Sequence, residues 1–169
     1  MSYAWTGPFG SASGKRPTVF APLGPNTVSL VVDDPWSPSS PDTTQIIVRD
    51  TQPPSLQVTL AATVLWPPDH RLVRVDAAVS VADACGDAPP QVVLTSVTSD
   101  QPDNGVADGD TDGDVQDADL ATFDGSVLLR AERAGNDPRG RTYTVTYTAT
   151  DASGNQTQTS ATVHVPLSQ

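Results

Sequence analysis

The fold is decided by the last long stretch of the chain, residues 142–165, which reads TYTVTYTATDASGNQTQTSATVHV. Apolar side chains alternate with threonines along both halves, which is the period-two pattern of a half-buried strand. The segment 151–155 (DASGN) separates the halves, and its residue types favour tight turns. The stretch therefore predicts a β-hairpin, with Tyr147 at a tyrosine-corner position that returns its hydroxyl to the backbone.

The same arrangement occurs earlier in the chain, at residues 27–50. There TVSLVVDDPWSPSSPDTTQIIVRD again gives an alternating strand, an Asp-led turn and a second alternating strand. A hairpin that is used twice indicates two β units in tandem. Further strands are predicted at residues 3–6, 17–21, 57–65, 71–81, 91–98 and 126–133. The predicted fold class is all-β, consisting of tandem immunoglobulin-like β-sandwiches.

The two predicted units differ in size. Residues 1–50 supply about four strands, so the first sandwich is predicted to be incomplete and to lack its opening strands. The Pro-rich segment 51–54 is predicted to be a short stiff linker. Residues 55–169 supply about seven strands, enough for a complete sandwich. An incomplete first sheet exposes an edge, which favours self-association.

The composition narrows the classes of function. The 169 residues carry 20 acidic and nine basic side chains, and 19 of the acids are aspartates. This balance argues against nucleic-acid binding, because there is no basic stripe to neutralise phosphates. No apolar run reaches the length of a membrane-spanning helix, so membrane insertion is not expected. The single cysteine, Cys85, excludes an intramolecular disulfide and is predicted to be a buried thiol.

The aspartates concentrate in residues 100–119, the Asp-rich loop, which holds eight of them and no lysine or arginine. Residues 108–119 (DGDTDGDVQDAD) have the spacing of a 12-residue calcium loop, with Gly113 at its sharp sixth position. Ca²⁺ prefers about six to eight oxygen ligands, and crowded carboxylates repel one another without a cation. The predicted ligands are Asp108, Asp110, Asp112, Asp114 through its carbonyl, Gln116 and Asp119, with Asp103 and Asn104 completing the shell or holding a second ion. The alternative is a solvated acidic loop that keeps the protein soluble.

A second candidate site lies at the junction of the predicted units. Asp50, Asp151 and Asn155 carry oxygens that would bind a cation and stiffen the linker. The alternative is that Asp151 and Asn155 only shape the hairpin turn, with Gly154 at positive φ.

Catalysis is not expected. His70 and His164 are the only histidines, and neither a nucleophile elbow nor a set of zinc ligands accompanies them. Trp36, in the Pro-rich turn of the first hairpin, is the best candidate for an exposed contact with a partner. Trp5, Trp36 and Trp66 would form a sugar-binding platform if two of them were coplanar and exposed. The alternative is that the aromatic residues fill the core or plug its ends.

Several motifs resemble repeat modules of large secreted bacterial proteins. Residues 3–10 (YAWTGPFG), 22–24 (PLG) and 27–33 (TVSLVVD) resemble the back half of a PKD-like repeat. The segment 50–54 (DTQPP) resembles the junction that opens HYR-like immunoglobulin-like modules. A subset of those modules is also similar to residues 65–70, 96–113, 129–133 and 147–155. The cysteine pair that HYR-like modules usually carry is missing. The resemblance implies spacers, adhesive modules or accessory domains on extracellular proteins.

Together these features predict a non-catalytic, extracellular structural or adhesive module of a larger bacterial surface or secreted protein, with Ca²⁺ in its Asp-rich loop. Its expected partners are other domains of the parent protein and a cell-surface protein or glycan. Two alternatives stay open. One is a carbohydrate-binding accessory module of a secreted hydrolase. The other is an assembly subunit whose exposed sheet edge accepts a strand from a neighbour.

Overall fold

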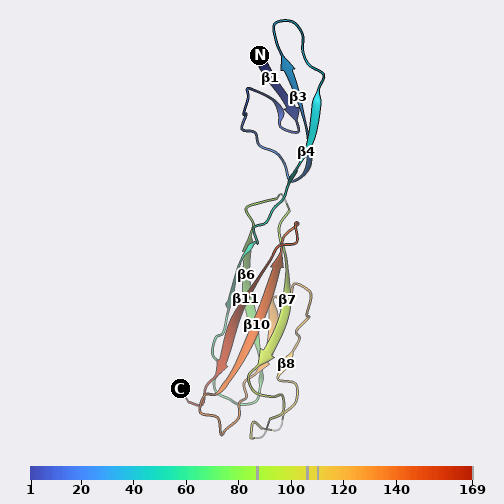
Figure 1. The fold of residues 1–169 in the computed structure, drawn as a ribbon. Coiled ribbons are helices and arrows are strands. Elements are labelled where there is room, and N and C mark those ends of the chain that lie inside the picture. The colour runs from blue at the N-terminus through green and yellow to red at the C-terminus, as the bar shows by residue number, and fades with distance from the viewer. Residues whose placement is uncertain (87, 106, 110, 169) are drawn as a thin grey trace. The chain divides into compact units, whose positions relative to one another are not determined.

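The computed structural model describes residues 1–86, 88–105, 107–109 and 111–168. It confirms the all-β prediction, because eleven strands and no helix occur in these ranges. The strands form three antiparallel sheets, and the chain divides into two compact units, Met1–Thr51 and Gln52–Gln169 (Figure 1). None of the described segments is a helix long and apolar enough to cross a membrane.

Unit 1 is one four-stranded sheet in the order β2-β1-β3-β4. Its strands are β1 (Ser2–Gly7), β2 (Gly10–Ser13), β3 (Gly24–Asp33) and β4 (Asp42–Val48). The predicted first hairpin is β3–β4, in which Thr27 pairs with Gln45. The segment 17–21, predicted to be a strand, forms none. It crosses the apolar face of the sheet instead, because hydrogen bonds fix the segment on either side of it.

Those hydrogen bonds hold both ends of residues 14–22, the covering segment of unit 1. The indole Nε1 of Trp5 donates to the carbonyl of Gly14 at 2.9 Å. The buried amide of Asn26 donates to the carbonyls of Pro22 and Gly24, each at 2.8 Å. A loop therefore takes the place of a second sheet over this face.

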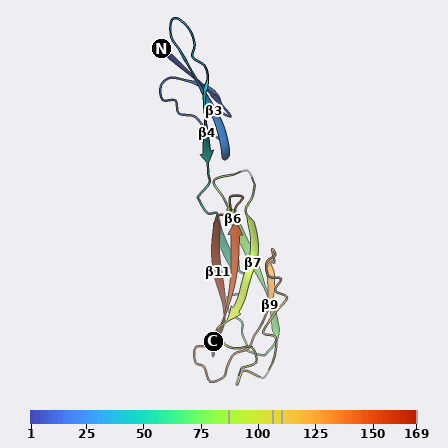
Figure 2. The same ribbon diagram turned by 45° about the vertical axis from the view of Figure 1, so that its right-hand side comes forward.

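Unit 2 consists of two sheets, which Figures 1 and 2 show in two views. One sheet has the order β11-β10-β7, and the other has the order β5-β6-β9-β8. Their bounds are β5 (Ser55–Leu60), β6 (Leu72–Ala82), β7 (Gln91–Ser99), β8 (Val115–Gln116), β9 (Ser126–Arg130), β10 (Arg141–Thr150) and β11 (Gln156–Val165). The predicted second hairpin is β10–β11, paired without a break from Arg141↔Val165 to Thr150↔Gln156.

The core of unit 2 lies between these sheets. It takes every second residue of β10, together with buried residues of the neighbouring strands and of the other sheet: Leu56, Val75, Leu94, Val127, Leu129, Tyr143, Val145, Tyr147 and Val163. A buried tyrosine needs a partner for its hydroxyl. The hydroxyl of Tyr147 donates to the carbonyl of Asp124 at 2.6 Å, and that of Tyr143 donates to the carbonyl of Arg130 at 2.9 Å. Both bonds join β10 to the segments that flank the facing sheet. Cys85 is half-exposed, so the prediction of a buried thiol is wrong.

Candidate functional site

The Asp-rich loop is organised around Arg141, the first residue of β10. Strand alternation places Arg141 on the same face as Tyr143 and Val145, so its side chain points into the unit and is 0% exposed. Its guanidinium donates to Oδ2 of Asp108 at 3.2 Å and to Oδ2 of Asp114. These two carboxylates are 1% and 3% exposed. Two aspartates of the loop thus face a buried cation that comes from the sheet.

Neutral groups complete the bonding of the Arg141 guanidinium. Nη2 donates to the carbonyl of Pro102 at 3.1 Å, and Nη1 donates to the hydroxyl of Tyr143 at 3.1 Å. Nε lies 3.3 Å from Oε1 of Gln101, which also accepts from the backbone of Ala134 at 2.8 Å. A guanidinium presents several donors in a rigid fork, so it joins both carboxylates and the loop backbone at once.

The titration of the groups around Arg141 follows from their burial. Desolvation raises the pKa of Asp114, and the hydrogen bond and charge of Arg141 oppose that rise. Burial raises the pKa of Tyr143 to about 12, although Arg141 pulls it down. Burial alone would lower the pKa of Arg141, but its bonds to Tyr143 and Asp114 outweigh this effect and raise it. Arg141 is therefore a permanent positive charge inside the unit.

Other predicted ligands hold the backbone of the loop. The carboxylate of Asp103 accepts from the amides of Asp114 at 2.8 Å and Gly113 at 3.1 Å, and these bonds lower its pKa. Gln116 donates its side-chain amide to the carbonyl of Gly113 at 3.0 Å. The carbonyl of Asp112 accepts from Arg130 at 2.8 Å. These bonds tie residue 103 to residues 113 and 114, and residue 112 to β9.

The predicted carbonyl ligand is used differently. The carbonyl of Asp114 accepts the backbone N–H of Arg130 at 2.9 Å, and its side chain accepts from Arg141. Asp119 lies beyond β8, where its backbone donates to Asp124 at 3.0 Å. Asn104 has a positive φ of 53°. Asp110 lies outside the described residues.

In the described part of the loop, no three acidic or histidine side chains place ligand atoms within 4.8 Å of one another. The structure brings Asp108 and Asp114 together, with a guanidinium at their meeting point. Calcium binding by the loop stays a prediction.

A third buried carboxylate lies beside this network. Glu132 is fully buried, and its Oε2 is 2.8 Å from Nδ1 of His70 and 2.5 Å from the hydroxyl of Thr111. Among the residues that the structure describes, neither its Oε1 nor Oδ1 of Asp114 has a hydrogen-bond partner. The latter lies 3.4 Å from Nε of Arg130, an ion-pair distance without hydrogen-bond geometry. Two of the three buried carboxylates, Asp108 and Asp114, thus meet guanidinium groups, whereas Glu132 meets His70 and Thr111.

Neither Arg141 nor Glu132 was among the predicted site residues. For Arg141 a signal was present, because it lies in phase with the apolar face of the alternating run that follows. The residues at 141, 143, 145, 147 and 149 share one face of the strand, and an arginine there must find buried partners. For Glu132 no local pattern indicates burial, since its partner His70 is 62 residues away.

The side chain of Asp151 shapes the hairpin turn through its hydrogen bonds. Oδ1 of Asp151 accepts from the amides of Ser153 at 2.9 Å and Asn155 at 2.8 Å, and Gly154 has a φ of 87°. Desolvation raises the pKa of Asp151, but the bonds from Asn155 and the turn backbone outweigh it and lower the pKa. Asp50 belongs to unit 1 and Asp151 to unit 2, so a junction cation site stays a prediction.

The candidate partner contact lies on an ordered turn. Trp36 is 90% exposed, as predicted. The carboxylate of Asp34 accepts from the amides of Trp36 at 2.9 Å and Ser37 at 3.0 Å, and these bonds lower the pKa of Asp34. Its role in binding stays a prediction.

Comparisons with known proteins found no family, no curated protein and no solved structure that matches this chain. The resemblance to PKD-like and HYR-like modules therefore stays a hypothesis.

Proposed function

We propose that this chain is a non-catalytic structural module of an extracellular protein, built as tandem immunoglobulin-like units. In this proposal, unit 2 is a sandwich whose Asp-rich loop is held rigid from within. The observation that carries the proposal is the fully buried guanidinium of Arg141 between the carboxylates of Asp108 and Asp114. A buried charge that is bonded on every side fixes one arrangement of the loop, which suits a load-bearing or adhesive spacer.

The side chains that could take part in catalysis instead support a structural role, because they form hydrogen bonds within the unit. Tyr143 and Tyr147 donate their hydroxyls to carbonyls. His70 contacts Glu132, and Nδ1 of His164 lies 3.4 Å from the hydroxyl of Thr142. A catalytic base instead needs a nucleophile or a substrate proton within hydrogen-bond reach.

We also propose that Ca²⁺ binds at the end of unit 2 that holds the Asp-rich loop. The three acidic side chains Asp108, Asp114 and Glu132 outnumber the two arginines, Arg130 and Arg141, at this end of unit 2, and His70 lies beside Glu132. Oδ1 of Asp114 and Oε1 of Glu132 are buried oxygens that accept no hydrogen bond within the described part of the chain. Carboxylate oxygens are the ligands that Ca²⁺ prefers, and exposed aspartates of the same loop would extend the set. Bound Ca²⁺ would add positive charge where the arginines fall short.

Thermal unfolding with and without the ion tests this part of the proposal. Saturating Ca²⁺ is expected to raise the Tm relative to chelator, because a ligand at about 100 times its Kd stabilises by about 2.7 kcal/mol. The double variant D110N/D112N should lose the difference, and Mg²⁺ should give a smaller one. A wild-type Tm that chelator does not change would refute calcium binding. It would leave the arginine-centred network standing, because substitution of Arg141 tests that network separately.

An assembly subunit is the second candidate, and a specific observation favours it. The exposed edge strand β4 carries Ile46 and Ile47, both more than a third exposed, in a sheet that has no second layer of strands. The glycan-binding alternative stays a prediction. Trp5 is half-buried beneath the covering segment, so within unit 1 only Trp36 presents a freely exposed indole.

A further inference from the structure

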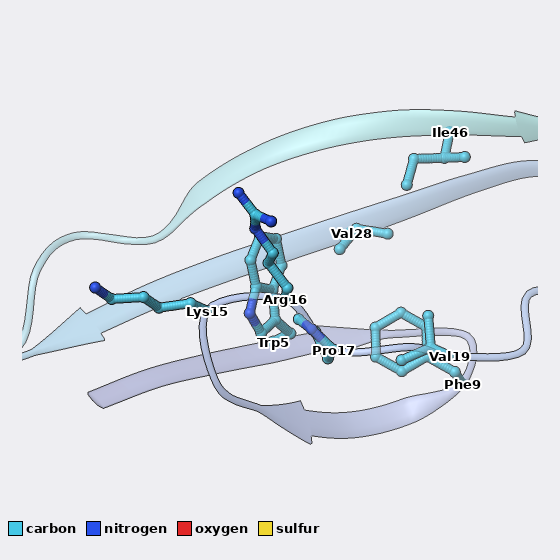
Figure 3. A pocket seen from close by; sticks show the side chains of 8 residues that line it. All are labelled: Trp5, Phe9, Lys15, Arg16, Pro17, Val19, Val28 and Ile46. Atoms are coloured by element: carbon cyan, nitrogen blue, oxygen red, sulfur yellow. The ribbon is translucent and has the colours of Figure 1, made fainter. Parts of the chain in front are cut away.

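Unit 1 carries a groove with an apolar floor and a basic rim. The groove has a volume of about 270 Å³, and Figure 3 shows the side chains that line it: Trp5, Phe9, Lys15, Arg16, Pro17, Val19, Val28 and Ile46. Lys15 and Arg16 are exposed, and no acidic side chain belongs to the described lining. The groove therefore suits a segment that combines large apolar side chains with negative charge.

The groove is built before any ligand arrives. The bonds of Trp5 to Gly14 and of Asn26 to Pro22 fix both ends of the segment that forms its wall. Gly7 leaves space for the ring of Phe9, because a Cβ at Gly7 would lie 2.7 Å from that ring. Preformed walls reduce the entropy that binding would otherwise cost.

Unit 2 presents a segment with the matching chemistry. Residues 117–124 (DADLATFD) connect β8 to β9, and their two large apolar side chains point outward. Leu120 is 52% exposed and Phe123 is 65% exposed. Asp117 and Asp119 precede them and are exposed as well. The neighbouring base, Arg74, donates to Asp76 at 2.7 Å. Arg74 also interacts with Asp117 and Asp124, but this acidic turn holds three aspartates against this one shared arginine and so has a negative balance.

The acidic turn is ordered, so its exposed apolar side chains are not free to collapse onto the sheet. The amide of Ala121 donates to the carbonyl of Leu94 at 2.9 Å, and the amide of Leu94 donates to the carbonyl of Thr122 at 2.7 Å. The amide of Asp119 donates to the carboxylate of Asp124 at 3.0 Å. Apolar side chains that a rigid turn holds in water mark an interaction site.

We propose that the acidic turn of one copy docks in the basic groove of unit 1 of a second copy. Leu120 and Phe123 would fill the apolar floor, and Asp117 and Asp119 would face Lys15 and Arg16. The contact joins two different surfaces, so copies associate head to tail, and the assembly either closes as a ring or extends. Opposite charges on the two surfaces also steer the encounter, and salt weakens that steering.

Sedimentation velocity over a range of protein concentrations tests the proposal. The wild type is expected to exceed the 17.6 kDa mass of one chain as concentration rises, and added NaCl is expected to reduce the associated fraction. The groove variant K15E/R16E and the turn variant L120S/F123S should each stay monomeric. Both change exposed side chains, so their circular dichroism should match that of the wild type. The control W36S, which removes an equally exposed apolar side chain elsewhere, should associate like the wild type.

The decisive experiment mixes the groove variant with the turn variant. K15E/R16E keeps its acidic turn, and L120S/F123S keeps its groove, so an equimolar mixture should form a one-to-one complex and nothing larger. A mixture that stays monomeric would overturn the proposal, because only a contact between two different surfaces is restored by mixing.

Two further outcomes would also overturn it. The first is a wild type that stays monomeric at every concentration. The second is association that the edge-strand variant T43K abolishes while K15E/R16E leaves it intact, because a lysine on β4 blocks pairing through the sheet edge and not docking in the groove. Failure on any of these points would leave the proposed role of the Arg141 network untouched.

Discussion

Replacing Arg141 by methionine should be among the most damaging single substitutions in unit 2. Methionine keeps an unbranched apolar stem of similar length but removes the charge and every hydrogen-bond donor. Asp108 and Asp114 would then stay buried beside each other without a cation. Removing one partner of a buried ion pair costs about 3–5 kcal/mol, and here two carboxylates lose the same partner. Since about 1 kcal/mol shifts the Tm of a domain of this size by roughly 4 °C, the expected loss is roughly 12–20 °C.

Urea unfolding followed by circular dichroism measures the loss in free energy of unfolding. Hydrogen exchange of β10 peptides assigns the transition to unit 2. The matched control is R139M, which breaks the solvent-facing pair of Arg139 with Asp137 and should lower the midpoint far less than R141M does. In wild type the pKa of Asp137 is held at about 2 by Arg139, and it should rise in this control.

The pH dependence of the R141M deficit gives a second readout. Burial raises the pKa of Asp114 above its usual 3.8, and Arg141 opposes that rise, so the pKa climbs further in the variant. A raised carboxyl pKa in the folded state means that stability falls as pH rises from the unfolded pKa through the folded one. The deficit should therefore be smallest near pH 4 and largest at pH 7. An R141M variant within about 1 kcal/mol of wild type at pH 7, or a deficit that does not change with pH, would refute the reasoning.

Three further outcomes are expected. Y147F should lose about 0.5–1.5 kcal/mol in urea unfolding, because the Asp124 carbonyl loses its buried partner; an unchanged midpoint would contradict this. D151N should be less stable than wild type at pH 7, because the lowered pKa of Asp151 contributes stability that is fully present above 3.8 and is lost as pH falls through its folded-state pKa. Thermal melts should show the gap closing over that range; a gap that persists in acid would count against the charge. L129A should lower the stability of unit 2 by about 2–5 kcal/mol, whereas I47A, at an exposed side chain, should lower that of unit 1 by less than about 0.5 kcal/mol. Equal losses would mean that Leu129 does not lie in the core.

The hairpins could be predicted because their determinants are local. In residues 142–165 the alternation, the Asp-led turn and the register all follow from adjacent residues, and the structure pairs the strands without a break. The segment 17–21 has the residue types of a strand but forms a covering loop, because the Asn26 amide and the Trp5 indole tie its flanks across the sheet. Such tertiary bonds leave no periodic signal. The two-residue strand β8 is too short to show an alternation.

The acidic loop was recognisable as a feature, but its organising partner was not. The number of aspartates in the loop indicates that a positive charge must lie near them. The spacing of these aspartates along the loop favours a metal ion as that charge. The structure brings in Arg141, which lies 27 residues after Asp114. Sequence spacing within the loop cannot predict a cation that a distant strand supplies. The phase of Arg141 with Tyr143 and Val145 was the one available indication, since it places a charged side chain on a core face.

Arginine side-chain NMR tests the central claim most directly, because it observes the Arg141 guanidinium itself. Fully buried and bonded to Asp108 and Asp114, its N–H protons should exchange slowly and give resolved signals at pH 7, with hydrogen-bond couplings to carboxylates. Those of the exposed Arg139 should exchange too fast to resolve. Arg141 N–H protons that exchange as fast as those of Arg139 would contradict the account.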